Sequence, residues 1–317
     1  MTTARAHTNI ALIKYWGKRD PALMLPYTSS LSMTLADYYT ETSVHFDGSL
    51  DADQFYLDGR KTPATQVSAF LDLVRQQSGK QEFATVTSAN HVPTTAGLAS
   101  SASAYAALAL AASRAAGMDL SPVELSRLAR RGSGSASRSI DGGFVIWHRG
   151  TDDATSFAEP VATQPTIPLR MVVVLVNGGQ KQVSSRAGMQ RTVETSPFYS
   201  DFVTTNEAAI EPMITALANN DFTTIGELTE ASSNQMHATM LAANPALSYF
   251  EPKTITALQH VQALRQAGIP AYATMDAGPN VKILTLAPFV DRIVNTLHQD
   301  FKTVTVTQPG PAATVID

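Results

Sequence analysis

The segment SASAYAALALAASRAA at residues 101–116 constrains the fold of this chain more than any other. It is rich in alanine, the residue that enters a helix at the lowest free-energy cost, and it is apolar on nearly every side. A helix that is apolar on nearly every side must be surrounded by other parts of the protein. We therefore expect a buried helix over 101–116, inside a folded domain.

The bulk composition agrees with a folded enzyme-sized protein. The 317 residues suffice for one large domain or two ordinary ones, and 44% are hydrophobic against 16% charged. The formal net charge is −4 without blocks of like charge, so we expect no nucleic-acid partner. The absence of cysteine excludes disulfides, thiolate nucleophiles and cysteine-based zinc sites.

The chain shows no targeting or membrane-spanning pattern. Charged residues interrupt its first segment, so we expect no signal peptide, and no apolar run approaches the length of a membrane span. The histidines lack metal-ligand spacing such as H-x-x-x-H. We therefore expect a cytoplasmic protein without a membrane partner.

Periodicity predicts several further helices. Val67, Phe70, Leu71 and Val74 recur at the spacing of one helical face. Ser121-Pro122-Val123-Glu124 combines a serine cap, proline at the first helical position and a capping-box glutamate. Other helices are expected over 199–217, 223–242, 252–267 and 288–299.

Strands are expected between these helices. The segment Met171–Val176 is a continuous apolar run, which indicates a central strand covered on both faces. The order of elements is not a regular βαβ alternation, so we favour an α+β fold over a doubly wound sheet. The candidate strands are 42–46, 53–57, 83–88, 143–148, 170–176, 271–275, 281–286 and 303–307.

One segment differs in texture from the rest of the chain. Residues 177–197, NGGQKQVSSRAGMQRTVETSP, are rich in glycine, serine and cations and follow the strongest strand. Loops of this length in compact domains are often functional. The segment is a domain junction, a functional loop, or both.

A Gly/Ser-rich stretch, PTTAGLASSAS at 93–103, precedes the alanine-rich helix. Gly97 permits a tight turn, and the unpaired amides of the helix N-terminus, the serine hydroxyls and the positive end of the dipole meet there. These features suit a phosphate, although the pattern G-x-x-x-x-G-K-[ST] is missing. An ordinary serine-capped helix explains them equally well.

Four more segments hold polar groups that suit chemistry, and each also has a plain structural explanation. Residues 9–35 bring Lys14, Lys18 and Arg19 around Tyr15 and Trp16, which alone indicates a strand, a loop and a strand with solvated charges. The other three are SGSASRSIDGG at 133–143, KQVSSRAGM at 181–189 and MDAGPN at 275–280. Arginine among small residues can hold a carboxylate or phosphate bidentately, but each segment also reads as a turn.

Together the segments resemble the diphosphomevalonate decarboxylases, a family in the superfamily of galacto-, homoserine, mevalonate and phosphomevalonate kinases. NIALIKYWGKRD, followed by LP and SSLSMTL, is specific to this family, and PTTAGLASSAS is similar to the superfamily's phosphate loop. SGSASRSIDGG, KQVSSRAGM, SNQMHA at 233–238 and MDAGPN follow in the family's order. The resemblance runs from Asn9 to about Pro311.

The resemblance implies a fold and a domain division. We expect the two-lobed α+β fold of the GHMP kinases, with a left-handed βαβ unit in an N-terminal lobe of the ribosomal-protein type and a ferredoxin-like C-terminal lobe. The lobes are expected at residues 1–180 and 181–317, with the active site in the cleft between them. A homodimer is also expected.

The implied reaction uses ATP and magnesium. ATP phosphorylates the tertiary hydroxyl of mevalonate 5-diphosphate, phosphate leaves, carbon dioxide is lost and isopentenyl diphosphate forms. Candidate catalytic residues are Asp276, Arg138 and Lys18, with Asp276 orienting or deprotonating the hydroxyl and facing the positive charge that develops later.

The resemblance also assigns binding residues. Lys181 and Ser184 are further candidate donors to the anions, and Ser101 is the candidate magnesium ligand beside phosphate oxygens and water. The predicted substrate-binding residues are Tyr15, Lys18, Arg138, Ser185 and Arg186. The predicted nucleotide-binding residues are Pro93, Gly97, Leu98, Ala99, Ser100, Ser101 and Ser103.

One residue departs from the family pattern. The family has an aromatic residue after R-S-[IL], where this chain has Asp141. A carboxylate three residues from Arg138 is expected to pair with it and to weaken its hold on an anionic substrate.

Three other functions remain open on the same scaffold. They are a kinase that stops after phosphoryl transfer, a decarboxylase of the monophosphate, and a ligand sensor without catalysis. Tyr15, Lys18, Arg138 and Ser185 favour the diphosphate and the full reaction, and a sensor would be free to lose Asp276.

Overall fold

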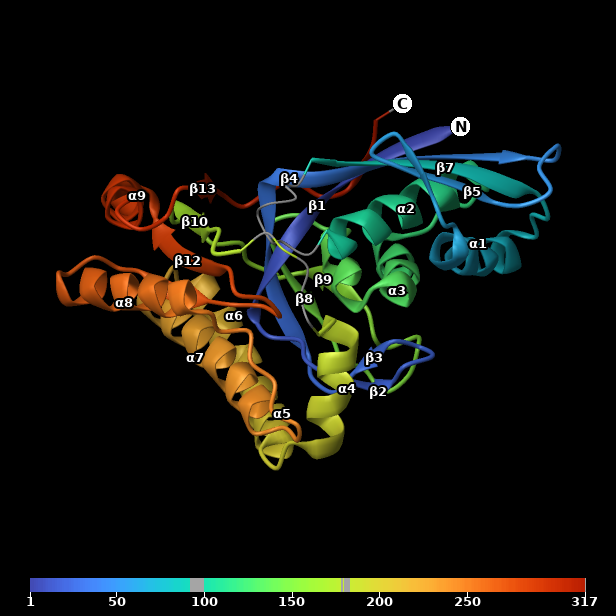
Figure 1. The fold of residues 1–317 in the computed structure, drawn as a ribbon. Helices are drawn as coiled ribbons and strands as arrows, with labels where there is room; N and C mark the ends of the chain where they lie inside the picture. The colour runs from blue at the N-terminus through green and yellow to red at the C-terminus, as the bar shows by residue number, and fades with distance from the viewer. Residues whose placement is uncertain (92–99, 178, 180–182, 317) are drawn as a thin grey trace.

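The computed structural model describes residues 1–91, 100–177, 179 and 183–316. Two β-sheets with their helices form two lobes that lie side by side (Figure 1). Where the chain is described, β5 (Gln54–Leu57) and β7 (Phe83–His91) pair in parallel and every other strand pairing is antiparallel. The α+β class is thereby confirmed.

The first lobe contains, within the described residues, an eight-stranded sheet in the order β14-β1-β4-β7-β5-β6, with β8 paired to β4 and β9 paired to β8. Helices α1 (Thr65–Ser78), α2 (Ser101–Ala115) and α3 (Pro122–Gly132) lie on one side of it (Figure 1). The remaining strands are β1 (Thr2–Ile13), β4 (Ser30–Asp47), β6 (Arg60–Thr62), β8 (Phe144–Trp147), β9 (Ala158–Pro160) and β14 (Thr314–Val315).

Helix α2 is the centre of this lobe, as its composition predicts. Its residues Ala106–Ala112 are buried between the sheet and the helices α1 and α3. Ser121 caps α3 and forms the expected capping box with Glu124.

The second lobe contains a sheet in the order β11-β12-β10-β13. Strand β10 (Leu169–Val174) is interior, with Met171 and Val173 in one hydrophobic cluster and Val172 and Val174 in another, so the doubly covered strand is confirmed. Strand β10 lies in the sheet of the second lobe, although its residues come before position 180, where we expect the first lobe to end. The boundary at residue 180 stays a prediction. The other strands are β11 (Tyr272–Thr274), β12 (Val281–Leu286) and β13 (Val304–Thr307).

Six helices accompany this sheet in the part of the chain that is described. They are α4 (Ser185–Thr195), α5 (Tyr199–Ala208), α6 (Ile210–Ala218), α7 (Phe222–Leu241), α8 (Pro252–Gln266) and α9 (Val290–Leu297). None of the described helices is long and apolar enough to cross a membrane.

Two expectations for this region were wrong. The single helix expected over 199–217 is divided into α5 and α6, because the ring of Pro212 clashes with the carbonyl of Ala208 and offers no N–H to it. Part of the segment 177–197 is helix α4 rather than loop. Ser184 caps α4 by accepting from the N–H of Ala187 at 3.2 Å.

The lobes share part of their core. Ile10 and Leu31 from the large sheet pack in one cluster with Met213 and Leu217 of α6. A short hairpin of β2 (Lys18–Asp20) and β3 (Leu25–Pro26) projects beside α4 (Figure 1). The junction of the lobes therefore places the segment after β1 against the helices of the second lobe.

Candidate functional site

A cleft opens where the two lobes meet. Its lining includes residues of β1, the β2–β3 hairpin, α2, α4 and the turn after β11. It has four cationic side chains and one carboxylate among these lining residues, namely Lys14, Lys18, Arg138, Arg186 and Asp276. An excess of cations in one cleft suits a ligand with several negative charges.

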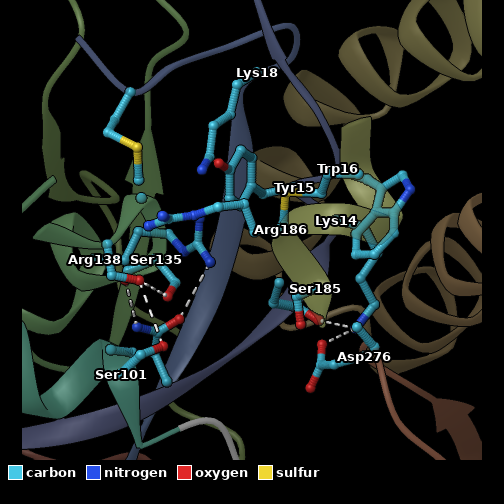
Figure 2. Close-up of a pocket in the computed structure, with 18 of the residues that line it drawn as sticks. Lys14, Tyr15, Trp16, Lys18, Ser101, Ser135, Arg138, Ser185, Arg186 and Asp276 are labelled. Atoms are coloured by element: carbon cyan, nitrogen blue, oxygen red, sulfur yellow. Dashed lines mark hydrogen bonds and ion pairs between the residues drawn. The ribbon is translucent and has the colours of Figure 1, made fainter. Parts of the chain in front are cut away.

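Asp276, two residues after the end of β11, lies between two buried lysines. One carboxylate oxygen, Oδ1, is 2.8 Å from Lys14 Nζ, and the other is 3.1 Å from Lys282 Nζ. The lysine side chains are 1% and 2% exposed, whereas Asp276 is 35% exposed toward the cleft. Figure 2 shows the pair of Lys14 and Asp276 on one side of the cleft. The carboxylate is thus fixed from behind and open in front.

The pKa of Asp276 follows from this arrangement. Burial alone raises the pKa, but the ammonium groups of Lys14 and Lys282 outweigh it and hold the pKa well below its usual range. Burial also lowers the pKa of Lys14, and Asp276 opposes that shift. Asp276 is therefore ionised at neutral pH and binds a proton weakly.

Arg138 is a buried cation on the opposite side of the cleft. It belongs to the 3₁₀ turn η2 (Gly134–Ser139), is 2% exposed, and donates to Ser30 Oγ at 2.5 Å and to Asn9 Oδ1 at 3.3 Å. No carboxylate in the described part of the chain lies within ion-pair distance of it, and its Nε lacks a partner there. Burial lowers its pKa to about 10, so it remains charged at neutral pH. A buried, unpaired guanidinium suits an anionic ligand.

Tyr15, Lys18 and Arg186 lie near this guanidinium. The Tyr15 hydroxyl is buried without a hydrogen-bond partner among the described residues, and burial raises its pKa, so it remains a donor. Burial and the neighbouring Arg186 both lower the pKa of Lys18. Figure 2 shows the three side chains on the same side of the cleft as Arg138, and Ser185 at the start of α4 closer to Asp276.

The N-terminus of α2 contributes hydroxyl groups. Ser101 is exposed in the cleft, with its Oγ 3.5 Å from that of Ser133, which lies 3.3 Å from that of Ser135. The structure places the predicted Ser103 elsewhere: its hydroxyl is buried against Thr8 and Thr40, so we do not retain it as a ligand. The predicted residues Pro93, Gly97, Leu98, Ala99 and Lys181 lie outside the described residues.

A second cavity borders the other side of this helix end. Ser100, Gln66 and Tyr105 line it, and the last two also line the cleft. Its walls are largely apolar, with Phe55, Leu57, Val67, Val86 and Leu108 among them. A flat apolar group joined to a phosphate chain can therefore extend from the cleft past the start of α2.

Asp141 does not pair with Arg138, contrary to our expectation. Its backbone oxygen accepts from Thr34 Oγ1 at 3.0 Å, and its Oδ2 is buried without a partner in the described structure. Burial and then the nearby charge of Glu159 raise its pKa. The short turn after η2 directs the carboxylate away from the guanidinium.

Sequence reasoning missed three site residues. Lys14 was named only as one of the cations in residues 9–35 and received no role, and Lys282 and Asn9 were not candidates, although Lys282 interrupts the apolar strand VKILTL and Lys14 follows the apolar run IALI. A lysine inside a buried strand needs a counter-charge, and this was the available signal. Asn9 donates to Ser135 O and Ser139 Oγ, which fixes the turn that carries Arg138.

The described residues contain no group of three or more His, Cys, Asp or Glu side chains arranged to hold a metal ion. The exposed Ser101 hydroxyl fits magnesium that arrives with a phosphate ligand, because magnesium binds hydroxyl, water and phosphate oxygens.

Comparisons with known proteins give the following matches. Residues 6–158 match the diphosphomevalonate decarboxylase-like N-terminal domain, and residues 171–312 match the mevalonate 5-diphosphate decarboxylase C-terminal domain. The chain is 38% identical to the diphosphomevalonate decarboxylase of Schizosaccharomyces pombe over 93% of this chain and 81% of that protein.

Solved structures agree. Mevalonate diphosphate decarboxylase from Staphylococcus aureus superposes with a TM-score of 0.96 at 43% identity, covering 100% of this chain and 98% of that one. A complex of MDDEF with MVAPP, AMPPCP and magnesium superposes with a TM-score of 0.95 at 46% identity, with the same coverage.

Proposed function

This chain belongs to the diphosphomevalonate decarboxylase family, and we propose that its interlobe cleft holds mevalonate 5-diphosphate between Arg138 and Asp276. The reaction is the ATP-dependent decarboxylation of mevalonate 5-diphosphate to isopentenyl diphosphate, with ADP, phosphate and carbon dioxide as the other products. The observation that carries the proposed placement is the buried guanidinium of Arg138, which faces the cleft without an acidic partner among the described residues.

The anions of the substrate meet the unpaired donors of the cleft. Arg138 can bind a carboxylate or phosphate bidentately, and Tyr15, Lys18, Ser185 and Arg186 offer further donors. Since these groups approach from both lobes, a ligand that bridges them neutralises repulsion among the cations. The substrate therefore completes the site electrostatically.

ATP lies along the start of α2 in this proposal. Its phosphates meet the helix N-terminus and the hydroxyls of Ser100 and Ser101, and its base occupies the apolar cavity between α1, β7 and α2. Ser101 supplies a hydroxyl ligand to magnesium, which when bound neutralises charge on the phosphates. The related protein MDDEF, which was solved with AMPPCP and magnesium, supports this choice of cofactors.

Asp276 orients the tertiary hydroxyl in this proposal. Its low pKa makes it a weak proton acceptor, because the best general base has a pKa near the operating pH. It accepts a hydrogen bond from the hydroxyl and directs the oxygen at the γ-phosphate. As the new O–P bond forms and ADP leaves, the hydroxyl proton passes to a phosphate oxygen. The same carboxylate then stabilises the positive charge that develops at the substrate carbon as phosphate departs.

The diphosphate rather than the monophosphate is the expected substrate. A second phosphate adds charge-assisted hydrogen bonds, each worth about 1.5–3 kcal/mol, to Lys18 and Arg186. We expect kcat/KM for the diphosphate to exceed that for the monophosphate by at least about tenfold. Competition between the two compounds in an assay of carbon dioxide release measures this ratio.

Two variants sharpen this comparison. Arg186→Met should reduce the preference for the diphosphate, whereas Arg191→Met, on the same helix but outside the cleft lining, should leave it unchanged. Equal kcat/KM for the two substrates in the wild type would contradict diphosphate recognition.

The homodimer and the cytoplasmic location also remain proposals.

A further inference from the structure

Helix α7 carries two consecutive serines whose hydroxyls bond groups outside the helix. Ser232 and Ser233 lie in its middle and are 2% and 3% exposed. A serine or threonine inside a helix usually bonds a carbonyl of the preceding turn, as Thr239 does with Met236 O at 2.7 Å. Serine favours a helix less than alanine does. Two buried serines inside a helix therefore indicate that their hydrogen bonds to residues outside the helix have a role.

Ser232 holds the backbone of Lys14. Its Oγ accepts from the N–H of Lys14 at 2.9 Å and donates to Oδ1 of Asn206 on α5 at 2.7 Å. Asn206, which is fully buried, returns its Nδ2 to the carbonyl oxygen of Lys14 at 2.9 Å. The N–H and the C=O of Lys14 are thus both hydrogen-bonded by side chains of the second lobe.

Lys14 needs such partners because its strand ends beside it. Strand β1 pairs with β4 as far as Ile13, so the backbone of Lys14 has passed the end of the ladder. Buried peptide groups without partners are strongly unfavourable. Ser232 and Asn206 provide the hydrogen bonds that a neighbouring strand would otherwise make, and they thereby fix the position of the Lys14 Cα.

Ser233 holds the backbone next to Asp276. Its Oγ accepts from the N–H of Met275 at 2.9 Å and donates to the carbonyl oxygen of Met275 at 3.3 Å. Met275 directly follows β11 and directly precedes Asp276. Adjacent residues of a helix point about 100° apart, so one step of α7 reaches both chain segments.

We propose that Ser232 and Ser233 are positioning residues for the reaction: they set the backbones of Lys14 and Asp276 so that the ammonium and the carboxylate meet at 2.8 Å. The two segments come from different lobes, and α7 is the element that bonds both of them through adjacent hydroxyls. This inference rests on the proposed role of Asp276.

The test uses activity in double-mutant cycles. A misplacement of a reacting group by about 1 Å can cost roughly 10²-fold in rate, so we expect Ser233→Ala and Ser232→Ala each to lower kcat by about tenfold or more. The KM for ATP should stay unchanged, because the nucleotide cavity lies on the first lobe. Thr239→Val removes a buried hydroxyl from the same helix and should leave kcat unchanged.

The cycle separates positioning from general stability. In an Asp276→Asn background, Ser233→Ala should cause no further loss of kcat, and in a Lys14→Met background the same holds for Ser232→Ala. If either alanine variant folds poorly, Ser→Cys keeps the side-chain shape with a weaker hydrogen-bonding group and should give a smaller loss.

The outcomes distinguish this inference from the proposed function. Unchanged kcat in both serine variants, or an equal loss with and without Asp276, would overturn the positioning role while leaving the proposed reaction intact. A fully active Asp276→Asn variant would overturn the role of Asp276 itself. Losses that vanish in the paired background, with Thr239→Val normal, support the inference.

Discussion

Asp276→Asn is expected to lower turnover by about 10²–10³-fold, the loss typical when one electrostatic stabiliser of a transition state is removed. Asparagine keeps the shape of the side chain but removes the charge that, in the proposed mechanism, orients the hydroxyl and faces the developing cation. Affinity for ATP should stay near that of the wild type, since a carboxylate does not hold phosphates. Side-by-side measurement of kcat and nucleotide Kd tests this, and a loss of turnover below about tenfold would contradict the catalytic role.

The same variant should also melt at a lower temperature. Lys14 and Lys282 lose their shared counter-charge, and a buried ammonium without a partner is destabilising. The melting temperature alone therefore cannot separate a catalytic carboxylate from a turn-forming one. The double variant Asp276→Asn/Lys282→Met removes one excess cation, and it should recover stability while turnover stays lost.

The pH dependence of this stability has a defined sign. The pKa of Asp276 is depressed in the folded state, so its stabilising effect is present above the unfolded-state pKa of about 3.9. It is lost as the pH falls through the lower folded-state pKa. The difference in melting temperature between wild type and Asp276→Asn should thus be full at neutral pH and shrink progressively as the pH falls below about 4.

Arg138→Met should abolish most activity with little effect on folding. Truncating one partner of a buried charge pair costs about 2–5 kcal/mol, which corresponds to a loss in kcat/KM of roughly 30-fold to several thousandfold. Arg138→Lys should not restore activity, because lysine lacks the planar pair of donors. In the ligand-free protein this guanidinium pairs with no carboxylate among the described residues, so the melting temperature should change little.

Arg130 on α3 supplies the matched control. It is also fully buried, and burial likewise lowers its pKa to about 10, but it pairs with Asp153 and donates to Ser156 O. Arg130→Met breaks that pair, which costs about 3–5 kcal/mol, and should lower the melting temperature clearly. If Arg138→Met destabilises the free protein as much as Arg130→Met and leaves kcat/KM unchanged, Arg138 is structural and not a ligand of the substrate.

Local signals predicted much of the fold. Segments that are apolar on all sides, such as α2 and β10, must be buried, so their burial could be predicted. The capping-box residues at the start of α3 likewise predicted where that helix begins. Pro212 was a visible signal for the break between α5 and α6 that the apolar periodicity concealed. Helix α4 was missed because its glycine and serine content resembles that of a loop. Gly188 lets α4 approach Leu247 and Trp16 closely.

The site was less predictable than the fold because its pairs connect distant segments. Asp276, Arg138 and Lys18 could be selected from motifs, but nothing in sequence spacing joins Lys14 to Asp276 or Lys282 to the same carboxylate. Such contacts arise only when β1, β11 and β12 are assembled. For the same reason the path of Asp141 away from Arg138 could not be read from a separation of three residues.

The most direct test of the account is the product stoichiometry of the purified protein with mevalonate 5-diphosphate and ATP. We expect each ADP formed to be accompanied by one phosphate and one carbon dioxide, because in the proposed reaction phosphorylation, loss of phosphate and decarboxylation occur in the same cleft. Formation of ADP with neither phosphate nor carbon dioxide released would identify a kinase and contradict the account.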